Sequence, residues 1–270
     1  KPLYDPYAAQ VITETHAEEL GIKILKYQMV VYIAEQDEYL QVDQVPEGVK
    51  PMNISGTELR RRLFKGIDIP EWFSYPSVVK ILRSRYPARQ DQGFTVFFTG
   101  LSGSGKSSIA NALRDHLLQD GRRPVTLLDG DEIRHHLSSE LGFSKEHRDL
   151  NIRRIGYVAS LISRSRGVCI VSAIAPYREA RRQARELVSK EGGFIEVHVS
   201  TPLDVCEARD RKGLYRKVRQ GLIKGFTGID DPYEAPENPE ILIDTSNKSV
   251  LQCVHQIILH LESEGYLGVN

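Results

Sequence analysis

A glycine-rich stretch directly behind an apolar run constrains the fold of this chain more than any other feature. The apolar run spans residues 94–99, and the positions Gly100, Gly105, Lys106 and Ser107 that follow it fit G-x-x-x-x-G-K-[ST]. Glycines lack side chains, so backbone N–H groups can surround phosphate oxygens, and the N-terminus of a following helix adds partial positive charge. Apolar residues recur at helical spacing behind the loop. This context favours a nucleoside triphosphate site over a glycine-rich turn without a ligand.

The loop residues have separate expected roles toward ATP and magnesium. In this motif Lys106 reaches the β- and γ-phosphates, and the Ser107 hydroxyl holds Mg²⁺. ATP and Mg²⁺ are therefore the expected cofactors. The residues of the loop that we predict to bind ATP are Gly100, Ser102, Gly103, Ser104, Gly105, Lys106, Ser107 and Ser108.

Short apolar runs alternate with helical segments after residue 93. The runs that predict further strands span residues 125–128, 168–171, 194–199 and 241–243. Strands separated by helices of about 10 to 20 residues are typical of a parallel sheet with helices on both faces. The predicted fold class is α/β, a P-loop NTPase-type parallel sheet with helices on both faces, preceded by a small α+β fragment. The active site should lie at the carboxyl ends of the strands.

The charge and hydropathy of the chain argue against two classes of partner. In 270 residues, 36 Lys and Arg balance 36 Asp and Glu, so no overall field favours nucleic acid. No apolar run approaches the roughly 18 residues of a membrane span.

Three cysteines are too few for a disulfide framework, which indicates a cytoplasmic protein. Because the chain begins with Lys1-Pro2 rather than Met, we expect a piece of a longer protein.

The first 50 residues predict elements that are too few to form a core alone. Residues 8–20 form an amphipathic segment, residues 29–33 a strand, and residues 46–48 a turn. Further along, residues 70–73 and 78–82 predict a helical end-piece. The polar stretch that follows, which begins at residue 86, predicts a linker and a domain boundary.

A capping box marks the start of a helix within this front part. The Ser55 side chain and Glu58 should close the N-terminus of a helix that runs through Leu63. The arginines at 60–62 point three ways around that helix. We expect these arginines to lie on a solvent-exposed face with one acidic partner, in preference to the alternative that they bind a phosphate group.

An acidic turn follows the strand predicted at 125–128. Residues 129–134 read Asp-Gly-Asp-Glu-Ile-Arg. Phosphoryl transfer needs metal and cations to stabilise the charge of the transferred group, and the acceptor hydroxyl must lose a proton. Asp131 is the candidate for orienting the waters of the metal or taking that proton, and Lys106 is the other catalytic candidate. The alternative is an acidic first turn that only suits the helix dipole.

A second polar cluster follows near residue 144. Ser144 should cap a helix on which Arg148 and Asn151, three residues apart, share one face. A guanidinium and a carboxamide there could bind an anionic nucleotide, and a surface network is the open alternative.

Six segments of the chain follow one another in a distinctive order: residues 100–107, 129–131, 151–155, 175–178, 209–215 and 224–230. Their order and spacing resemble adenylyl-sulfate kinase over about residues 93–262. The resemblance implies phosphorylation of the 3′-hydroxyl of adenosine 5′-phosphosulfate (adenylyl sulfate) by ATP and magnesium. It also implies a homo-oligomer, at least a dimer.

Carried over by position, the resemblance implies a set of substrate contacts. Phe143 and Phe226 would sandwich the adenine of adenylyl sulfate, since stacking of a base on an aromatic ring is worth about 1 to 3 kcal/mol. Lys212 and the glycine-rich segment around Gly225 look like the family's lid, whose closure would exclude water. The implied substrate-binding residues are Asp131, Arg134, Phe143, Arg148, Asn151, Ile174, Ala175, Lys212, Gly225 and Phe226, and Arg209 and Thr245 would hold the ATP base.

The chain departs from the family pattern at Ala175. The family often has a serine there, which has been discussed as a phosphoryl acceptor. Alanine has no hydroxyl, so a phosphoenzyme through this position is excluded and direct in-line transfer is expected.

The front piece resembles the carboxyl-terminal part of ATP sulfurylase, on residues 53–60, 29–32 and 5–7. The nucleotide-binding motifs of that family are absent here, so this chain should not make adenylyl sulfate. We therefore expect an incomplete sulfurylase-like part at residues 1–86, a linker at 87–92 and the kinase domain at 93–270, as in bifunctional sulfate-activating enzymes.

Two other functions compete with a working kinase. Some sulfurylases carry a kinase-like tail that binds the phosphorylated product as an allosteric inhibitor without catalysis, and Ala175 is compatible with that role. Lys106 and Ser107 argue for catalysis, because an effector-binding relic would be free to lose its triphosphate contacts. A P-loop kinase for another small metabolite would leave the Phe143 and Phe226 pair a coincidence.

Overall fold

The computed structural model describes residue 5 and residues 7–268. The contacts divide the chain into two compact units. The N-terminal unit comprises residues 1–63 and 67–85, and the C-terminal unit comprises residues 64–66 and 86–270.

The N-terminal unit is a small α+β arrangement. The strands β1 and β2 pair in antiparallel fashion, with Val31 opposite Leu40. The Tyr32 ring stacks on Trp72, with centroids 5.2 Å apart and planes 4° apart. The elements are α1 (Ala8–Thr15), α2 (Ala17–Leu20), β1 (Val30–Ile33), β2 (Glu38–Gln41), η1 (Val42–Gln44), α3 (Gly56–Lys65) and α4 (Pro76–Arg85).

Helix α3 begins with one half of the predicted capping box, the cap by Ser55, whereas the Glu58 side chain bonds two arginines of the helix instead of the Ser55 backbone. The Ser55 hydroxyl accepts a hydrogen bond from the Glu58 backbone N–H (3.1 Å). The Glu58 carboxylate accepts from Arg61 Nε (2.6 Å) and Arg62 Nε (3.0 Å). The arginine run therefore has the acidic partner expected for it, and the Arg61 hydrogen bond lowers the pKa of Glu58 to about 2.

The C-terminal unit is built on a five-stranded sheet in the order β4-β5-β3-β6-β7, and every neighbouring pair is parallel. All five strands lie where the apolar runs predict them. The central strand β3 is buried along its whole length, as expected of a strand with neighbours on both sides and helices on both faces. The strands are β3 (Phe94–Thr99), β4 (Val125–Asp129), β5 (Val168–Ser172), β6 (Gly193–Val199) and β7 (Ile241–Ile243).

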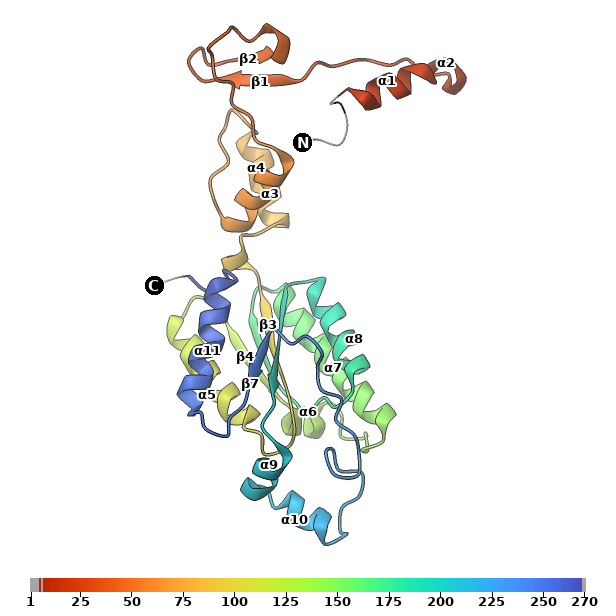
Figure 1. Ribbon diagram of the computed structural model, residues 1–270, viewed down its shortest axis with the longest axis vertical. Coiled ribbons are helices and arrows are strands. Elements are labelled where there is room, and N and C mark those ends of the chain that lie inside the picture. Colours follow the sequence, from red (N-terminus) through yellow and green to blue (C-terminus); the bar gives the residue numbers. More distant parts are fainter. Residues whose placement is uncertain (1–4, 6, 269–270) are drawn as a thin grey trace. The chain divides into compact units, whose positions relative to one another are not determined.

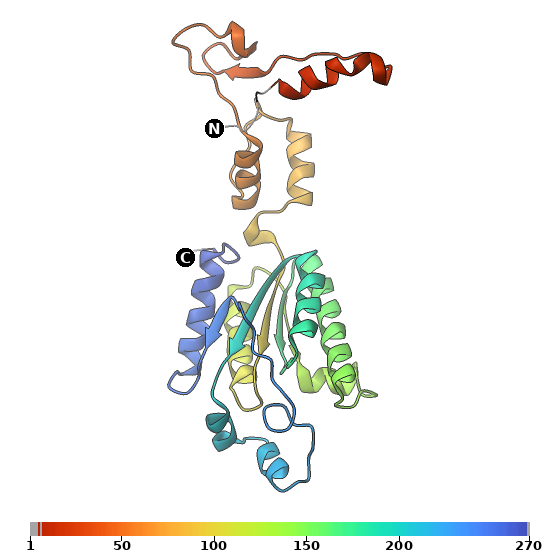
Figure 2. The same ribbon diagram turned by 45° about the vertical axis from the view of Figure 1, so that its right-hand side comes forward.

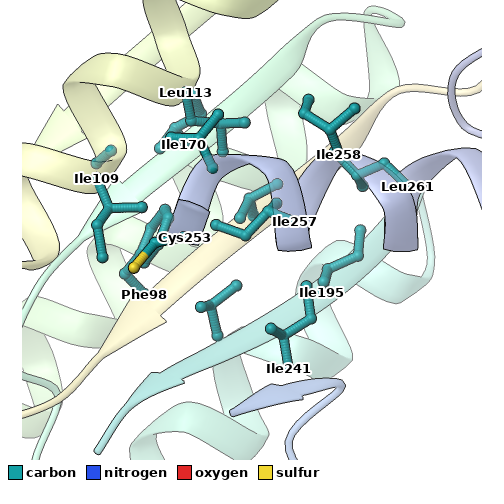
Figure 3. Close-up of a cluster of buried hydrophobic side chains, with 14 of the residues drawn as sticks. Phe98, Ile109, Leu113, Ile170, Ile195, Ile241, Cys253, Ile257, Ile258 and Leu261 are labelled. Atoms are coloured by element: carbon teal, nitrogen blue, oxygen red, sulfur yellow. The ribbon is translucent and has the colours of Figure 1, made fainter. Parts of the chain in front are cut away.

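Helices cover both faces of this sheet (Figure 1 and Figure 2). Helices α5 (Lys106–Asp120) and α11 (Val250–Ser263) pack on one face, where their apolar residues form one cluster with the strands. Figure 3 shows residues of this cluster, with Cys253 and Ile257 of α11 above the strands. Helices α7 (Lys145–Arg164) and α8 (Arg178–Ser189) form a second cluster on the other face. The two clusters confirm the predicted fold class.

Shorter elements connect these layers. They are η2 (Arg89–Asp91), α6 (Gly130–His136), α9 (Leu203–Arg209) and α10 (Leu214–Arg219). Among the residues that the structure describes, no helix is both long and apolar enough to cross a membrane. Cys169, Cys206 and Cys253 are buried free thiols.

The segment before β3, predicted as a linker, is held on the C-terminal unit. The Arg89 guanidinium lies 4.1 Å from the centroid of the Tyr266 ring. Arg123 donates to Gln92 O (2.6 Å) and to Tyr266 O (2.7 Å). A Cβ on Gly93 would lie 2.1 Å from Ser163 O, so glycine is required at this close approach. These contacts fix the chain where it enters the sheet.

A buried histidine in β6 predicts a pH dependence of stability. His198 is 9% exposed, and its ring stacks on Tyr233 with centroids 5.7 Å apart. Burial, together with the charge of Arg181, lowers the pKa of His198 from 6.5 to about 4. Below the unfolded-state pKa the unfolded chain takes up a proton that the folded protein does not. We therefore expect the free energy of unfolding to fall by about 3 kcal/mol as the pH drops from 6.5 to about 4.

Urea unfolding of wild type and His198→Gln across this pH range measures the effect. The variant should lack most of the decrease. Glu58 and Glu179, whose pKa values are lowered from 4.5 to about 2, begin to lose their contribution to stability below about pH 4.5, and they do so equally in both proteins. Equal pH dependence in both proteins would show that His198 does not cause it.

Candidate active site

The strand, glycine loop and helix predicted from the sequence are present at the carboxyl edge of the sheet. Strand β3 ends at Thr99, and α5 begins at Lys106. Gly100 has φ +147°, and a Cβ there would lie 2.4 Å from Val199 O. Gly105 has φ +104°, a left-handed conformation that favours glycine. The loop therefore requires glycine at both positions, at Gly100 because of the close approach to β6 and at Gly105 because of the left-handed backbone.

The ammonium group of Lys106 lies inside this loop. Lys106 is 7% exposed, and its Nζ donates to Leu101 O (2.6 Å) and to Ser104 Oγ (3.4 Å). Burial lowers the pKa of Lys106 to about 8. An anionic ligand in the loop would counter this loss of hydration and favour the protonated form.

Three side-chain oxygens meet at the start of α5. Ser107 Oγ donates to Asp129 Oδ2 (3.1 Å) and lies 3.1 Å from Ser172 Oγ. Asp129 ends β4 and Ser172 ends β5, so the parallel sheet brings both next to the loop. Hard oxygen ligands of this kind are those that Mg²⁺ prefers. The donor set fits a magnesium ion that also uses phosphate oxygens.

Asp129 lies beside Ser107 in the structure but was not among the predicted metal ligands. Its Oδ1 accepts from the Asp131 backbone N–H (3.0 Å), so the same carboxylate caps α6 and faces Ser107. The signal was its position directly after the strand predicted at 125–128, at the edge where the site lies. Among the described residues, no group of three or more His, Cys, Asp and Glu is placed to hold a metal, so the side-chain oxygens at this site would need phosphate oxygens or water to complete the coordination.

Asp131 and Lys212, which are far apart in the sequence, form an ion pair. Asp131 lies in the first turn of α6, and Lys212 lies between α9 and α10. Both side chains are more than half exposed. The charges of Asp129, Asp131 and Lys212 all act on the pKa of Lys106. The structure therefore brings the two predicted catalytic residues and the predicted lid lysine to one site.

The two residues predicted to hold the ATP base lie beside the loop. Arg209 donates from Nη1 to Thr245 Oγ1 (2.7 Å) and from Nη2 to Thr245 O (2.8 Å). Thr245 Oγ1 donates in turn to Ser104 O (2.9 Å). Arg209 also reaches Gly103 O (3.4 Å), so the ends of α9 and β7 are joined to the loop backbone. Ser102 accepts at its carbonyl from Tyr215 Oη (2.9 Å), and Ser108 is exposed in the first turn of α5.

Arg148 links the two segments that carry the predicted adenine-stacking rings. Ser144 caps α7 as predicted, accepting from the His147 backbone N–H (3.3 Å). Near this helix start, Arg148 Nε donates to Phe143 O (2.8 Å), and Nη1 donates to Thr227 Oγ1 (2.7 Å). Nη2 donates to Gly225 O (2.5 Å). One side chain, 8% exposed, thus holds the Phe143 segment and the Gly225–Thr227 segment together.

The two aromatic rings themselves are accessible. Phe143 is 66% exposed, and the Arg134 guanidinium lies 4.5 Å from its ring centroid. The Phe226 ring is half-buried and packs edge-on against Tyr215, with centroids 5.0 Å apart. Each ring therefore has surface available for a base.

Two guanidinium groups give this region positive charge, and an amide oxygen beside them is free to accept a hydrogen bond. Burial, and then the charge of Arg148, lowers the pKa of Arg134. Arg134 Nη1 donates to Gly142 O (3.0 Å). Asn151 is 5% exposed, and its Oδ1 is buried without a hydrogen-bond partner. An unpartnered buried amide oxygen is a feature that a ligand donor would relieve.

Ile174 and Ala175 lie next to the start of the glycine loop. Ile174 O accepts from Thr99 Oγ1 (2.7 Å) and from the Gly100 backbone N–H (3.3 Å). Ala175 is buried and has φ +46°, an uncommon value for a residue with a Cβ. Its carbonyl accepts from Arg181 Nη1 (2.6 Å), a contact with no signal in the sequence.

The comparisons with known proteins match the chain in two parts. The family model described as adenylylsulphate kinase matches residues 92–244, and the one described as ATP-sulfurylase matches residues 1–85. A sulfate adenylyltransferase of Chaetomium globosum is 55% identical over 264 residues, which cover 98% of this chain and 46% of that protein. Another, of Aspergillus oryzae, is 56% identical over 263 residues, with shares of 97% and 46%. The chain thus spans less than half the length of these relatives.

Solved structures agree with the family models. A hexameric APS kinase from Thiobacillus denitrificans is 44% identical with a TM-score of 0.77, covering 99% of this chain and 47% of that chain. The Mycobacterium tuberculosis APS kinase in complex with AMPPNP and APS is 44% identical with a TM-score of 0.61, covering 63% of this chain and 98% of that chain. The resemblance stated from the sequence is confirmed: the chain belongs to the adenylylsulphate kinase family and carries a piece of an ATP-sulfurylase domain in front.

Proposed function

We propose that this chain transfers the γ-phosphoryl group of ATP to the 3′-hydroxyl of adenosine 5′-phosphosulfate, giving 3′-phosphoadenosine 5′-phosphosulfate. The observation that carries the proposal is that the buried Lys106 ammonium, the Ser107–Asp129 hydrogen bond and the Asp131–Lys212 ion pair lie around the loop that follows β3. Family membership and the likeness to an APS kinase solved with AMPPNP and APS support the same activity.

Each residue at the phosphate side of the site would have its own role in the phosphoryl transfer. Lys106 would stabilise the negative charge that spreads over the transferred group. Ser107, Asp129 and Asp131 would hold magnesium, which when bound neutralises phosphate charge. Asp131 would also orient the acceptor hydroxyl and take its proton. Lys212, released from Asp131 by the ligands, would add positive charge beside the phosphates.

The substrate side would bind adenylyl sulfate by stacking and by charge. Phe143 and Phe226 would hold the adenine. Arg134 and Arg148 would contact its anionic groups, and the amide oxygen of Asn151 would accept from one of its N–H or O–H groups. Because Ala175 has no hydroxyl, the phosphoryl group would pass directly between the two nucleotides. The loop residues, with Arg209 and Thr245, would bind ATP.

The proposal extends to the organisation of the protein. We assign residues 1–86 to an incomplete sulfurylase part, 87–92 to a linker and 93–270 to the kinase domain. The buried free thiols support a cytoplasmic setting. A homo-oligomer is supported by the related kinase that is described as hexameric. The product-binding regulatory role is disfavoured because the chain retains Lys106, Ser107 and Asp129, the side chains that would bind a triphosphate and its metal, and holds them at the loop.

A turnover assay tests the function. Purified protein with ATP and Mg²⁺ should release ADP only when adenylyl sulfate is added, and one phosphorylated product should form per ADP. ATP with sulfate should give no adenylyl sulfate. Tight binding of the phosphorylated product without any turnover would instead support the regulatory role.

A further inference from the structure

A buried arginine on α8 joins two segments that line the candidate active site. Arg181 is 3% exposed. Its Nη1 donates to Ala175 O (2.6 Å), and its Nη2 donates to Glu234 O (2.6 Å). Ala175 lies in the turn after β5, and Glu234 ends the segment of residues 225–234, which we name the strap. One guanidinium group thus ties the turn to the strap.

The charge of Arg181 is balanced inside the protein. Its Nε lies 2.9 Å from Glu196 Oε1 on β6, and both side chains are at most 10% exposed. Arg185 pairs with Glu196 (3.3 Å) and with Glu240 (2.6 Å). Burial of an arginine is tolerated when its charge is paired and its N–H groups are hydrogen-bonded. Glu196 therefore balances the charge of the guanidinium, and the two carbonyls that accept from Nη1 and Nη2 fix its position.

The turn that Arg181 holds is under backbone constraint. Ala175 has φ +46°, in the left-handed region that an alanine enters only when its surroundings hold it there. The preceding carbonyl, Ile174 O, accepts from Thr99 Oγ1 (2.7 Å) and from Gly100 N–H (3.3 Å). The position of this turn therefore constrains the position of Gly100, the first residue of the phosphate loop.

The strap is fastened at several points along its length. Arg148 binds Gly225 O and Thr227 Oγ1 at its start. Tyr177 Oη donates to Asp231 Oδ1 (2.9 Å) in its middle. At its end, the Glu234 backbone N–H donates to Pro176 O (2.8 Å) beside the Arg181 bond. Phe226 lies between Gly225 and Thr227, the two residues that Arg148 binds.

We infer that Arg181 is a positioning residue for the adenylyl sulfate side of the site. By bridging Ala175 O and Glu234 O, it sets the strap, and with it Phe226, at a fixed place relative to the phosphate loop. This inference rests on the proposed function. A lysine cannot replace the guanidinium here, because a single ammonium lacks the planar fork that spans two carbonyls while Nε faces Glu196.

The experiment compares Arg181→Lys with a matched change on the same helix. Arg185→Lys removes a guanidinium from the same charge cluster, but the hydrogen bonds of Arg185 go to the carboxylates of Glu196 and Glu240. Arg181→Lys should raise the KM for adenylyl sulfate about tenfold, since the loss of a charged hydrogen bond corresponds to about that factor. The KM for ATP should stay within about twofold, and Arg185→Lys should leave both KM values within about twofold.

Other outcomes would overturn the inference. Equal changes in both KM values, no change in either, or the same effect from Arg185→Lys would show that Arg181 only stabilises the fold. A wild-type protein without turnover would contradict the proposed function itself, which is a separate result.

Hydrogen exchange of the wild-type protein tests the link without any variant. Adding adenylyl sulfate should slow exchange in the strap and in residues 175–181 together, because Arg181 couples the two. Protection of the strap alone would overturn the inference, even if Arg181→Lys failed to fold.

Discussion

Replacing Lys106 by alanine lowers kcat by about 100- to 1000-fold, the expected loss when one charge-stabilising group of a phosphoryl-transfer site is removed. The ammonium lies in the loop, within hydrogen-bond distance of Leu101 O and Ser104 Oγ. No second lysine donates to these loop oxygens among the described residues, and Lys212 is paired with Asp131. Steady-state release of ADP with saturating ATP and adenylyl sulfate measures the loss.

The control for Lys106→Ala is Lys248→Ala, an exposed lysine bonded to Gln256. It should leave kcat unchanged. Thermal unfolding of both variants should stay close to wild type, because the removal of a buried cation does not uncover an unpaired charge. A Lys106→Ala protein that keeps more than about a tenth of kcat would contradict the assigned role of Lys106.

The pH profile gives a second readout of the same residue. In the free protein Lys106 loses its proton near pH 8. Because kcat/KM reports the groups of the free enzyme, kcat/KM for ATP should fall as the pH rises through about 8. The Lys106→Ala protein should lack that decrease.

Replacing Phe226 by alanine raises the dissociation constant of adenylyl sulfate about 5- to 150-fold, which corresponds to the roughly 1 to 3 kcal/mol of one base stacked on an aromatic ring. The Phe226 ring packs against Tyr215, which is itself fixed by a hydrogen bond to Ser102 O. Tyr215 therefore keeps its place when Phe226 is shortened. Titration calorimetry with adenylyl sulfate measures the change.

Two controls separate stacking from a general loss of structure. Phe226→Tyr should keep most of the affinity, because it keeps the ring. Tyr157→Ala removes an exposed ring from α7, outside the candidate site, and should change nothing. Unchanged affinity of Phe226→Ala for adenylyl sulfate would remove that ring from the site, while a parallel loss of ATP affinity would indicate damage to the loop beside Ser102.

The sheet and the phosphate loop could be predicted because their signals are local. Parallel strands buried on both faces appear as continuous apolar runs, and the loop requires glycines at fixed positions. Strand β2 (Glu38–Gln41) was not predicted, because it is short and only half-buried, so it lacks an apolar run. Pairing with β1 decides its structure.

The contacts of the site were harder to predict because they join distant parts of the chain. The sequence places Asp129 at a strand end, but only the order of the sheet brings it to Ser107. Asp131 and Lys212 are 81 residues apart, and only the resemblance placed Lys212 at the site. Arg181 lies on a helix with many charges, and nothing in its spacing distinguishes it from its exposed neighbours.

The contacts that residues 86–93 make within the C-terminal unit decide where the chain can be cut without a loss of stability. A protein that starts at Tyr86 keeps Gln92 O as an acceptor for Arg123 and keeps Arg89 against Tyr266, although it loses the Phe64 ring that also contacts Arg89. A protein that starts at Phe94 loses all of these contacts at the amino end of the central strand. The protein that starts at Phe94 should therefore unfold at a lower temperature than the one that starts at Tyr86. A cut between the two units should leave the eight residues before β3 on the C-terminal unit.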